Sequence, residues 1–262
     1  MKVAPPKFLY KYMAADTDEH LRRAREAIVQ SQVYFAVPAK LNDPFEGKVI
    51  PDFSASREEQ ELHWRAKRGS LPPMSDAEFE EGLAGLLANH GSEAQIKAFE
   101  HEILSMHEKS GVYCMFPRHD SLAMWAYYGG GHQGVCLRYV MSEAFVQWSF
   151  AEGRMLLPVR YDHAYPRIRF FGRENESRML SMLSTKSREW KHEREWRIVW
   201  RDSSGLAEMP RQHLDCVLVG VAASEITKAA VVEMAKERQP RLAVFGGQVK
   251  RRQFDLEFQR LL

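Results

Sequence analysis

The stretch 186–200 holds the densest set of side chains that could do chemistry. Its apolar residues Trp196, Ile198 and Trp200 alternate with other residues, and this period of two predicts a strand. The other face would carry Glu195 and Arg197, joined by Glu193 if the strand begins earlier. Two carboxylates beside an arginine are costly next to an apolar face unless partners or a ligand compensate them. A polar site is therefore one interpretation, and a solvated outer face with a Glu–Arg ladder is the other.

A second polar segment, Asn42–Gly47 (NDPFEG), follows the apolar run VYFAV. Asn and Asp before proline favour a turn, and their side chains can bond to nearby backbone amides. A structural turn is the first interpretation of this loop. Because loops at strand ends often carry function, the second is that Asn42, Asp43 and Glu46 line a cleft.

A third segment runs from Met124 to Gly134 and is rich in aromatic residues and glycine. Trp125 and Tyr128 are three residues apart, so on a helix they share a face, which is more often core than a platform for a ligand. The glycine triplet 129–131 permits close backbone approach, but its spacing matches neither a P-loop nor a dinucleotide fingerprint.

These segments must be positioned by an ordinary folded chain. Apolar runs predict strands at 8–12, 33–37, 112–116, 134–140, 155–161, 195–200, 214–221, 242–245 and 254–258. Helical patterns cover 16–30, 121–128, 142–150, 174–191 and 224–237, and Ser75 and Ser92 open two more helices in a separate block at 55–110. This order predicts an α+β fold: a single domain, 1–262, with a twisted mixed or antiparallel sheet, flanking helices and a helical insertion at about 55–110.

Composition narrows the class of protein. Of 262 residues 45% are hydrophobic, and 37 Lys and Arg stand against 35 Asp and Glu, so the net charge of +2 attracts the chain neither to nucleic acid nor to membranes. There is no long apolar run and no secretion signal, and the three cysteines lack metal-ligand spacing. We expect a soluble cytoplasmic protein with buried thiols, no membrane contact and no bound metal at the main site.

Read together, the segments resemble a bacterial family, the domain of unknown function 2971. The motifs that carry the resemblance are LYKY at 9–12, LNDPFEG at 41–47, MWAYY at 124–128, HQGV at 132–135, Lys186, Trp190, Glu193, Glu195–Arg197 and VLVG at 217–220. They span most of the chain except the block at 55–110, and their joint order is more specific than any one of them. The family name implies no activity.

More remotely, the chain is similar to the ADP-ribosyltransferase superfamily, which implies a related fold and NAD as the substrate. The corresponding places in chain order are Tyr10, Lys11 and Tyr12 on the first strand, 34–46 on the second, and Glu193–Arg194–Glu195 as the late Glu-x-Glu pair. The chain departs from the superfamily in lacking a clear first-strand Arg or His and the Ser-Thr-Ser signature.

The resemblance implies roles for these residues. Glu195 would stabilise the oxocarbenium-like ribose through its 2′-hydroxyl, and Glu193 would orient or deprotonate the acceptor, which stays open. Tyr12, Trp125 or Tyr128 would stack on nicotinamide or adenine, and Arg197 or Lys186 would bind pyrophosphate. We therefore expect Glu195→Gln to abolish NAD turnover and to leave the fold intact. This chemistry would suit an effector of the toxin or phage-defence kind.

Two alternatives remain. Glu189-Trp190-Lys191 has the Glu-x-Lys form of a metal-dependent nuclease, with Mg²⁺ held by carboxylates such as Asp43 or Asp162 and phosphate met by Arg154, Arg160, Arg167, Arg169, Arg173 and Arg178. The other is a non-enzymatic module that holds a small ligand or a partner protein. Both enzyme hypotheses require the acidic pair of the late strand to face the Asn42–Gly47 loop across a ligand-sized hollow.

Overall fold

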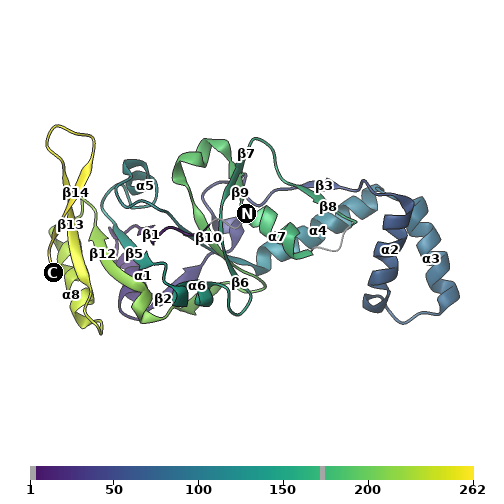
Figure 1. Cartoon of the computed structure of the whole chain (residues 1–262), viewed down its shortest axis with the longest axis horizontal. Helices are drawn as coiled ribbons and strands as arrows, with labels where there is room; N and C mark the ends of the chain where they lie inside the picture. The colour runs from purple at the N-terminus through teal and green to yellow at the C-terminus, as the bar shows by residue number, and fades with distance from the viewer. Residues whose placement is uncertain (1–3, 172–174) are drawn as a thin grey trace. The chain divides into compact units, whose positions relative to one another are not determined.

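The computed structural model describes residues 4–171 and 175–262, which form two compact units (Figure 1). Unit 1 comprises Met1–Ala36, Gly111–Val159 and Glu189–Leu262, and unit 2 comprises Val37–Ser110 and Arg160–Arg188. Both contain helices and strands, so the predicted α+β class is confirmed. The expectation that 1–262 forms a single domain stays a prediction.

The main sheet of unit 1 is mixed, as the sequence predicts. Its strand order is β1 (Phe8–Met13), β5 (Val135–Val140), β12 (Leu214–Val219), β13 (Ala243–Val249) and β14 (Leu256–Arg260). Only β12 and β13 pair in parallel among these neighbours, because helix α8 (Glu225–Glu237) makes the crossover that a parallel pair needs. Strands β13 and β14 form a long hairpin beside β12 (Figure 1).

A second sheet of unit 1 carries the stretch with the acidic pair. It places β10 (Trp196–Trp200) between β4 (Gly111–Met115) and β6 (Arg154–Pro158), with antiparallel pairing on both sides. Because β10 is central, Trp196 to Val199 are all buried. The interpretation of this strand as a solvated outer face is therefore wrong.

Smaller elements complete unit 1. Strand β2 (Gln32–Phe35) pairs with β11 (Gly205–Glu208), and η4 (Arg211–His213) precedes β12. Helix α1 (Asp18–Ile28) packs against α8, while α5 (Leu122–Tyr127) and α6 (Glu143–Ser149) follow β4 and β5 in the chain. Apolar side chains of α1, α8 and both sheets share one core, which contains Ile28, Leu137, Ile198, Val217 and Val231.

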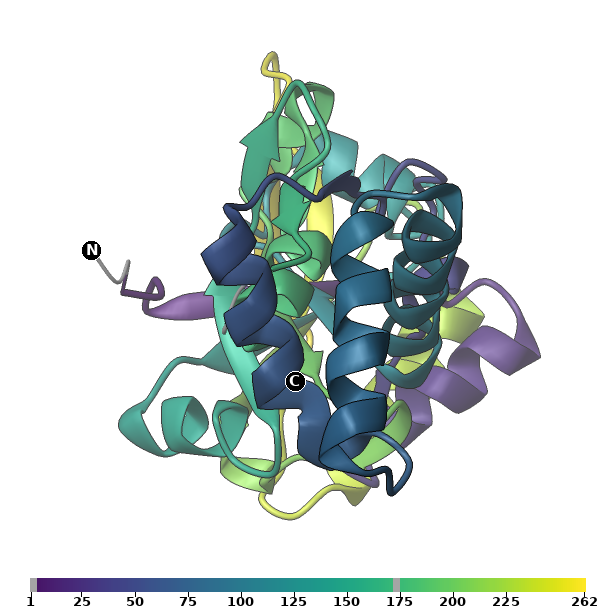
Figure 2. The ribbon, with the colours of Figure 1, turned by 90° about the vertical axis from the view of Figure 1, so that its right-hand side faces the viewer.

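Unit 2 is mainly helical. It contains α2 (Arg57–Lys67), α3 (Asp76–Ala88), α4 (Glu93–Lys109) and α7 (Asn175–Leu183), with the short helices η1 (Pro38–Lys40) and η2 (Arg68–Ser70). Helices α2 and α3 lie side by side in both views (Figures 1 and 2). Two parallel strand pairs join distant segments: β3 (Ile50–Asp52) with β8 (Arg167–Arg169), and β7 (Arg160–Asp162) with β9 (Thr185–Ser187). Phe53, Phe99, Phe170 and Phe171 contact one another between these elements.

The predicted helix at 174–191 is wrong in its second half. Helix α7 ends at Leu183, where the Ser184 and Thr185 hydroxyls donate to carbonyls of the last turn. The chain then forms β9 and the short helix η3 (Arg188–Glu193). Side-chain hydroxyls that bond to the backbone compete with continued helix, and β7 supplies a strand partner that local periodicity does not reveal.

Other local corrections are smaller. The strand expected over 155–161 is two strands, β6 and β7, divided at Val159. Glu174 and Arg173 lie outside the described residues, as does the side chain of Arg178. Every helix in the described part of the chain is too short or too polar to cross a membrane.

Candidate functional site

Glu195 and Arg197 form a buried ion pair in unit 1. The Nε and Nη2 atoms of Arg197 donate to the two carboxylate oxygens of Glu195 at 2.7 and 2.9 Å, and each residue is only 2% exposed. Arg197 lies opposite Cys114 of β4 in the sheet. Burial, and then the negative charge of Glu195, raise the pKa of the Cys114 thiol. The Glu-Arg ladder of the sequence is therefore an internal, bidentate pair, the strongest geometry for these two groups.

Glu193 has a different partner. At the end of η3, its Oε1 accepts a 2.7 Å hydrogen bond from the Tyr128 hydroxyl, and Glu193 is 2% exposed. Tyr128 is half-buried at the end of α5, and its ring stacks on Phe116 with centroids 5.1 Å apart. The structure thus brings together the aromatic segment and the acidic pair, which are separated by 65 residues.

The residue between the two glutamates has an unusual backbone. Arg194 has a φ of 50°, in the left-handed region that non-glycine residues seldom adopt. It joins η3 to β10 and is itself exposed. This turn carries the chain from a helical path into a strand and leaves both carboxylates buried. Backbone conformations of this cost persist where surrounding contacts over-determine them, and they cluster at functional sites.

Two aromatic residues near Glu193, the exposed Tyr127 and the half-buried Trp190, were not among the predicted site residues. Tyr127 is 59% exposed, and its ring meets that of Trp190 on η3 edge to face, with centroids 6.0 Å apart. Trp190 also contacts His192. The sequence contains a signal for the exposure of Tyr127. On a helix, residues two positions apart point to different faces, so a helix that buries Trp125 directs Tyr127 away from the core.

Tyr10, Tyr12 and Trp125 belong to a core cluster of unit 1 instead of to a surface. Trp125 is fully buried and its indole N–H donates to the His119 carbonyl at 2.7 Å, while the Tyr12 hydroxyl donates to the Arg118 carbonyl at 2.7 Å. The stacking role expected of Tyr12 and Trp125 does not fit this packing, because each ring already occupies the interior. Lys11 places its ammonium over the ring of Tyr113.

In unit 2, the Asn42–Gly47 loop uses its acidic residues structurally. The Asp43 carboxylate accepts the backbone N–H of Phe45 at 2.9 Å, which closes the turn expected of an Asp-Pro sequence. Glu46 pairs with Lys186 at 3.2 Å, and both side chains are almost completely buried. Asn42 is exposed. The pyrophosphate role expected of Arg197 and Lys186 does not fit either, because both cations are buried in ion pairs.

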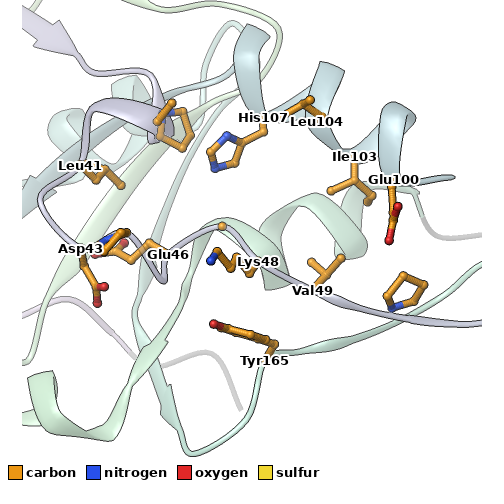
Figure 3. A pocket seen from close by; sticks show the side chains of 15 residues that line it. Leu41, Asp43, Glu46, Lys48, Val49, Glu100, Ile103, Leu104, His107 and Tyr165 are labelled. Carbon is orange, nitrogen blue, oxygen red and sulfur yellow. The ribbon is translucent and has the colours of Figure 1, made fainter. Parts of the chain in front are cut away.

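Asp43 and Glu46 also line a cavity of about 650 Å³ within unit 2 (Figure 3). Its walls are the 38–51 segment, helix α4 and Tyr165, which precedes β8. In Figure 3, His107 and Ile103 reach into this space from α4. Asp43 and Glu46 thus line a cavity to which Glu193 and Glu195 of unit 1 do not contribute.

The predicted site residues therefore fall into two sets. Unit 1 holds Tyr10, Lys11, Tyr12, Trp125, Tyr128, Glu193, Glu195 and Arg197, and unit 2 holds Asn42, Asp43, Glu46 and Lys186. That the two sets face each other across a hollow stays a prediction. Glu189 and Lys191 lie on η3, not on the strand that the nuclease hypothesis needs. Among the described residues no group of three or more His, Cys, Asp or Glu side chains is placed to hold a metal ion.

Comparison with known proteins adds one finding. The model of a family described as a protein of unknown function (DUF2971) matches residues 124–198. This segment begins in α5 and ends in β10, so it contains Trp125, Tyr128, Glu193, Glu195 and Arg197. The resemblance to that family is thus supported over the stretch that forms the polar cluster of unit 1. A search of curated proteins and one of solved structures each gave no significant match.

Proposed function

We propose that this chain cleaves the bond between nicotinamide and ribose in NAD, as an ADP-ribosyltransferase or an NAD glycohydrolase. The observation that carries the proposal is the Tyr128–Glu193 pair: a carboxylate withdrawn from solvent, held by a tyrosine hydroxyl at 2.7 Å, near the exposed ring of Tyr127. A carboxylate in low-dielectric surroundings stabilises developing positive charge far better than one in water.

The chemistry is a displacement at the anomeric carbon of the nicotinamide ribose. The glycosidic C–N bond breaks with its electron pair moving to the ring nitrogen, so nicotinamide leaves neutral and positive charge develops on the ribose. In the proposal the ribose 2′-hydroxyl replaces the Tyr128 hydroxyl as the partner of Glu193, and the carboxylate offsets that charge. Water or another nucleophile then attacks the anomeric carbon and loses its proton.

The proposal gives Glu193 the role that the sequence-based resemblance gave to Glu195, the stabilisation of the ribose. Both oxygens of Glu195 are held by Arg197, so we assign Glu195 and Arg197 as positioning residues that fix the start of β10. The exposed Tyr127 and the half-buried Trp190 replace Tyr12 and Trp125 as the rings that would stack on the nicotinamide or adenine base. An enzyme that depletes NAD or modifies an essential acceptor would arrest growth, as a toxin or phage-defence effector does.

The test is release of nicotinamide from NAD by the purified full chain. We expect Glu193→Gln to lower the rate by about 10²-fold or more, because the amide keeps the shape and can still accept from Tyr128 but carries no charge. Glu257→Gln, on the exposed edge strand β14, is the matched control and should leave the rate unchanged. Equal rates for Glu193→Gln and the parent chain, or no release by the parent chain, would contradict the proposal. Mg²⁺-dependent cleavage of nucleic acid without nicotinamide release would support the nuclease hypothesis in its place.

A further inference from the structure

The cavity of unit 2 has two chemically different ends (Figure 3). The polar ends of His107, Lys48 and Tyr165 are directed toward the side where Asp43 and Glu46 lie. The opposite side is lined by the aliphatic residues Val49, Ile103 and Leu104 and by Glu100. Its volume of about 650 Å³ lies in the range of sites for small organic molecules, roughly 300–1,000 Å³. A cavity divided in this way suits an amphipathic ligand.

His107 is the most informative residue of the lining. It is 9% exposed, and its Nε2 atom has no hydrogen-bond partner among the described residues. Burial lowers the pKa of its imidazole, which favours the neutral form. A buried polar atom without a partner costs about 1–3 kcal/mol, so most such atoms are satisfied by protein, water or ligand. This nitrogen is enclosed by the protein at Gly47, so it holds the imidazole against the loop and does not itself face the cavity.

Gly47 explains how the imidazole can lie where it does. A Cβ atom at position 47 would be 2.0 Å from Nε2 of His107, and the residue has a φ of 72°. Only glycine satisfies both conditions, since it has no side chain and tolerates the left-handed region. The loop and α4 are therefore shaped to each other around this nitrogen.

The charges of the lining indicate the head group. Glu46 is offset by its buried partner Lys186, and Asp43 is held by the Phe45 amide. Lys48 is exposed, and the contact the structure gives its ammonium is the ring of Phe45 at 5.5 Å, not a carboxylate. The Lys48 ammonium and the Tyr165 hydroxyl are directed to the same side and present donors, and an anionic group is the best acceptor for them.

We propose that this cavity binds a small carboxylic acid with an apolar body. The carboxylate would accept from Lys48 and from the Tyr165 hydroxyl, and the body would lie against Val49, Ile103 and Leu104. The proposal concerns unit 2 alone and does not depend on the activity proposed for unit 1.

Three probes with one apolar body separate the contributions: octanoate, octanol and octylamine, each titrated into the full chain by isothermal calorimetry. We expect octanoate to bind about tenfold or more tightly than either of the others, because only its head group is anionic. Its affinity should fall with added salt, since Lys48 is exposed. Equal affinities for the three, tighter binding of octylamine, or no binding of octanoate would overturn the proposal.

Two variants locate the site. Lys48→Met keeps the aliphatic stem and should remove most of the preference for octanoate over octanol, while Leu104→Gln should weaken both by a similar factor. Lys40→Met removes an exposed cation of the same segment that does not line the cavity and is the matched control. Loss of the octanoate preference in Lys40→Met as well, or its retention in Lys48→Met, would contradict the assignment of Lys48.

Discussion

At the scale of single residues, the central feature is a set of charges inside the protein. The sequence predicts that Glu195 and Arg197 share a face of a strand, and the structure places both in the interior as a bidentate pair. Attraction between buried charges offsets their desolvation only while both partners are present. This changes the expectation that Glu195→Gln spares the fold, because the substitution removes a carboxylate that binds the buried guanidinium of Arg197 through two hydrogen bonds.

We therefore predict that Glu195→Gln lowers the free energy of unfolding by about 3–5 kcal/mol. The double variant Glu195→Leu with Arg197→Met should lose much less, since it removes both charges together. Urea denaturation of the full chain measures both effects, and Glu208→Gln on the exposed face of β11 is the control. If Glu195→Gln and Glu208→Gln have the same free energy of unfolding, the Glu195–Arg197 ion pair does not stabilise unit 1.

At the scale of elements, helix starts are set by short local patterns. Ser56 with Glu59, and Ser75 with Glu78, form complete capping boxes in which each side chain bonds to the backbone of the other residue. Serine caps predict the helix starts at Ser75 and Ser92, and the start at Ser56 was not predicted. The ends of β10 and α7 are not set by local patterns of this kind. They depend on strand pairing with segments far away in the chain.

Removing one of these caps should have a local effect. We predict that Ser75→Ala destabilises α3 by about 1 kcal/mol, since the backbone N–H of Glu78 at its start loses the Ser75 hydroxyl as its acceptor. Faster amide hydrogen exchange in 76–88 would report this loss. Ser70→Ala, in the exposed η2 turn that lacks a side-chain cap, should leave that exchange unchanged. Equal exchange in both variants would show that tertiary packing alone holds α3.

At the scale of the whole molecule, buried histidines couple stability to pH. Burial lowers the pKa of His107, His119 and His213, and both ring nitrogens of His213 lack a hydrogen-bond partner among the described residues. In the folded chain the pKa of each of these histidines lies below the ordinary value of 6.5. At pH values between the folded and the unfolded pKa, the unfolded chain therefore binds more protons than the folded chain. The stabilisation is complete above the unfolded pKa and is lost as pH falls through the folded one.

We accordingly expect the free energy of unfolding to decrease as pH falls from about 7 to 5, above the range in which most carboxylates titrate. His213→Gln cannot take up a proton and should flatten this dependence. His192→Gln removes an exposed histidine and serves as the matched control. Denaturation curves at several pH values measure the slopes, and identical slopes in the two variants would exclude His213 as a source.

Much of the fold could be predicted because its signals are local. Alternation located β1 and β10, serine caps located α3 and α4, and a continuous apolar run located β12. The short strands β3, β8 and β9 were missed, since each has three residues and is defined by a partner more than twenty positions away. For the candidate site, the residue types and the core position of Trp125 could be predicted, but the contact between Tyr127 and Trp190 could not, because it joins residues far apart in the chain.

The amino-acid sequence by itself determined which segments carry the polar and aromatic residues and which class of fold they enter, because hydrophobic period and caps act within a few positions. Only the tertiary structure decided that Glu193 bonds to Tyr128, that Arg197 turns to Glu195, and that His107 lies over Gly47. Partner choice of this kind depends on burial and strand pairing between residues far apart in the chain. No local pattern encodes it, because the energy of a buried charge depends on what surrounds it in space.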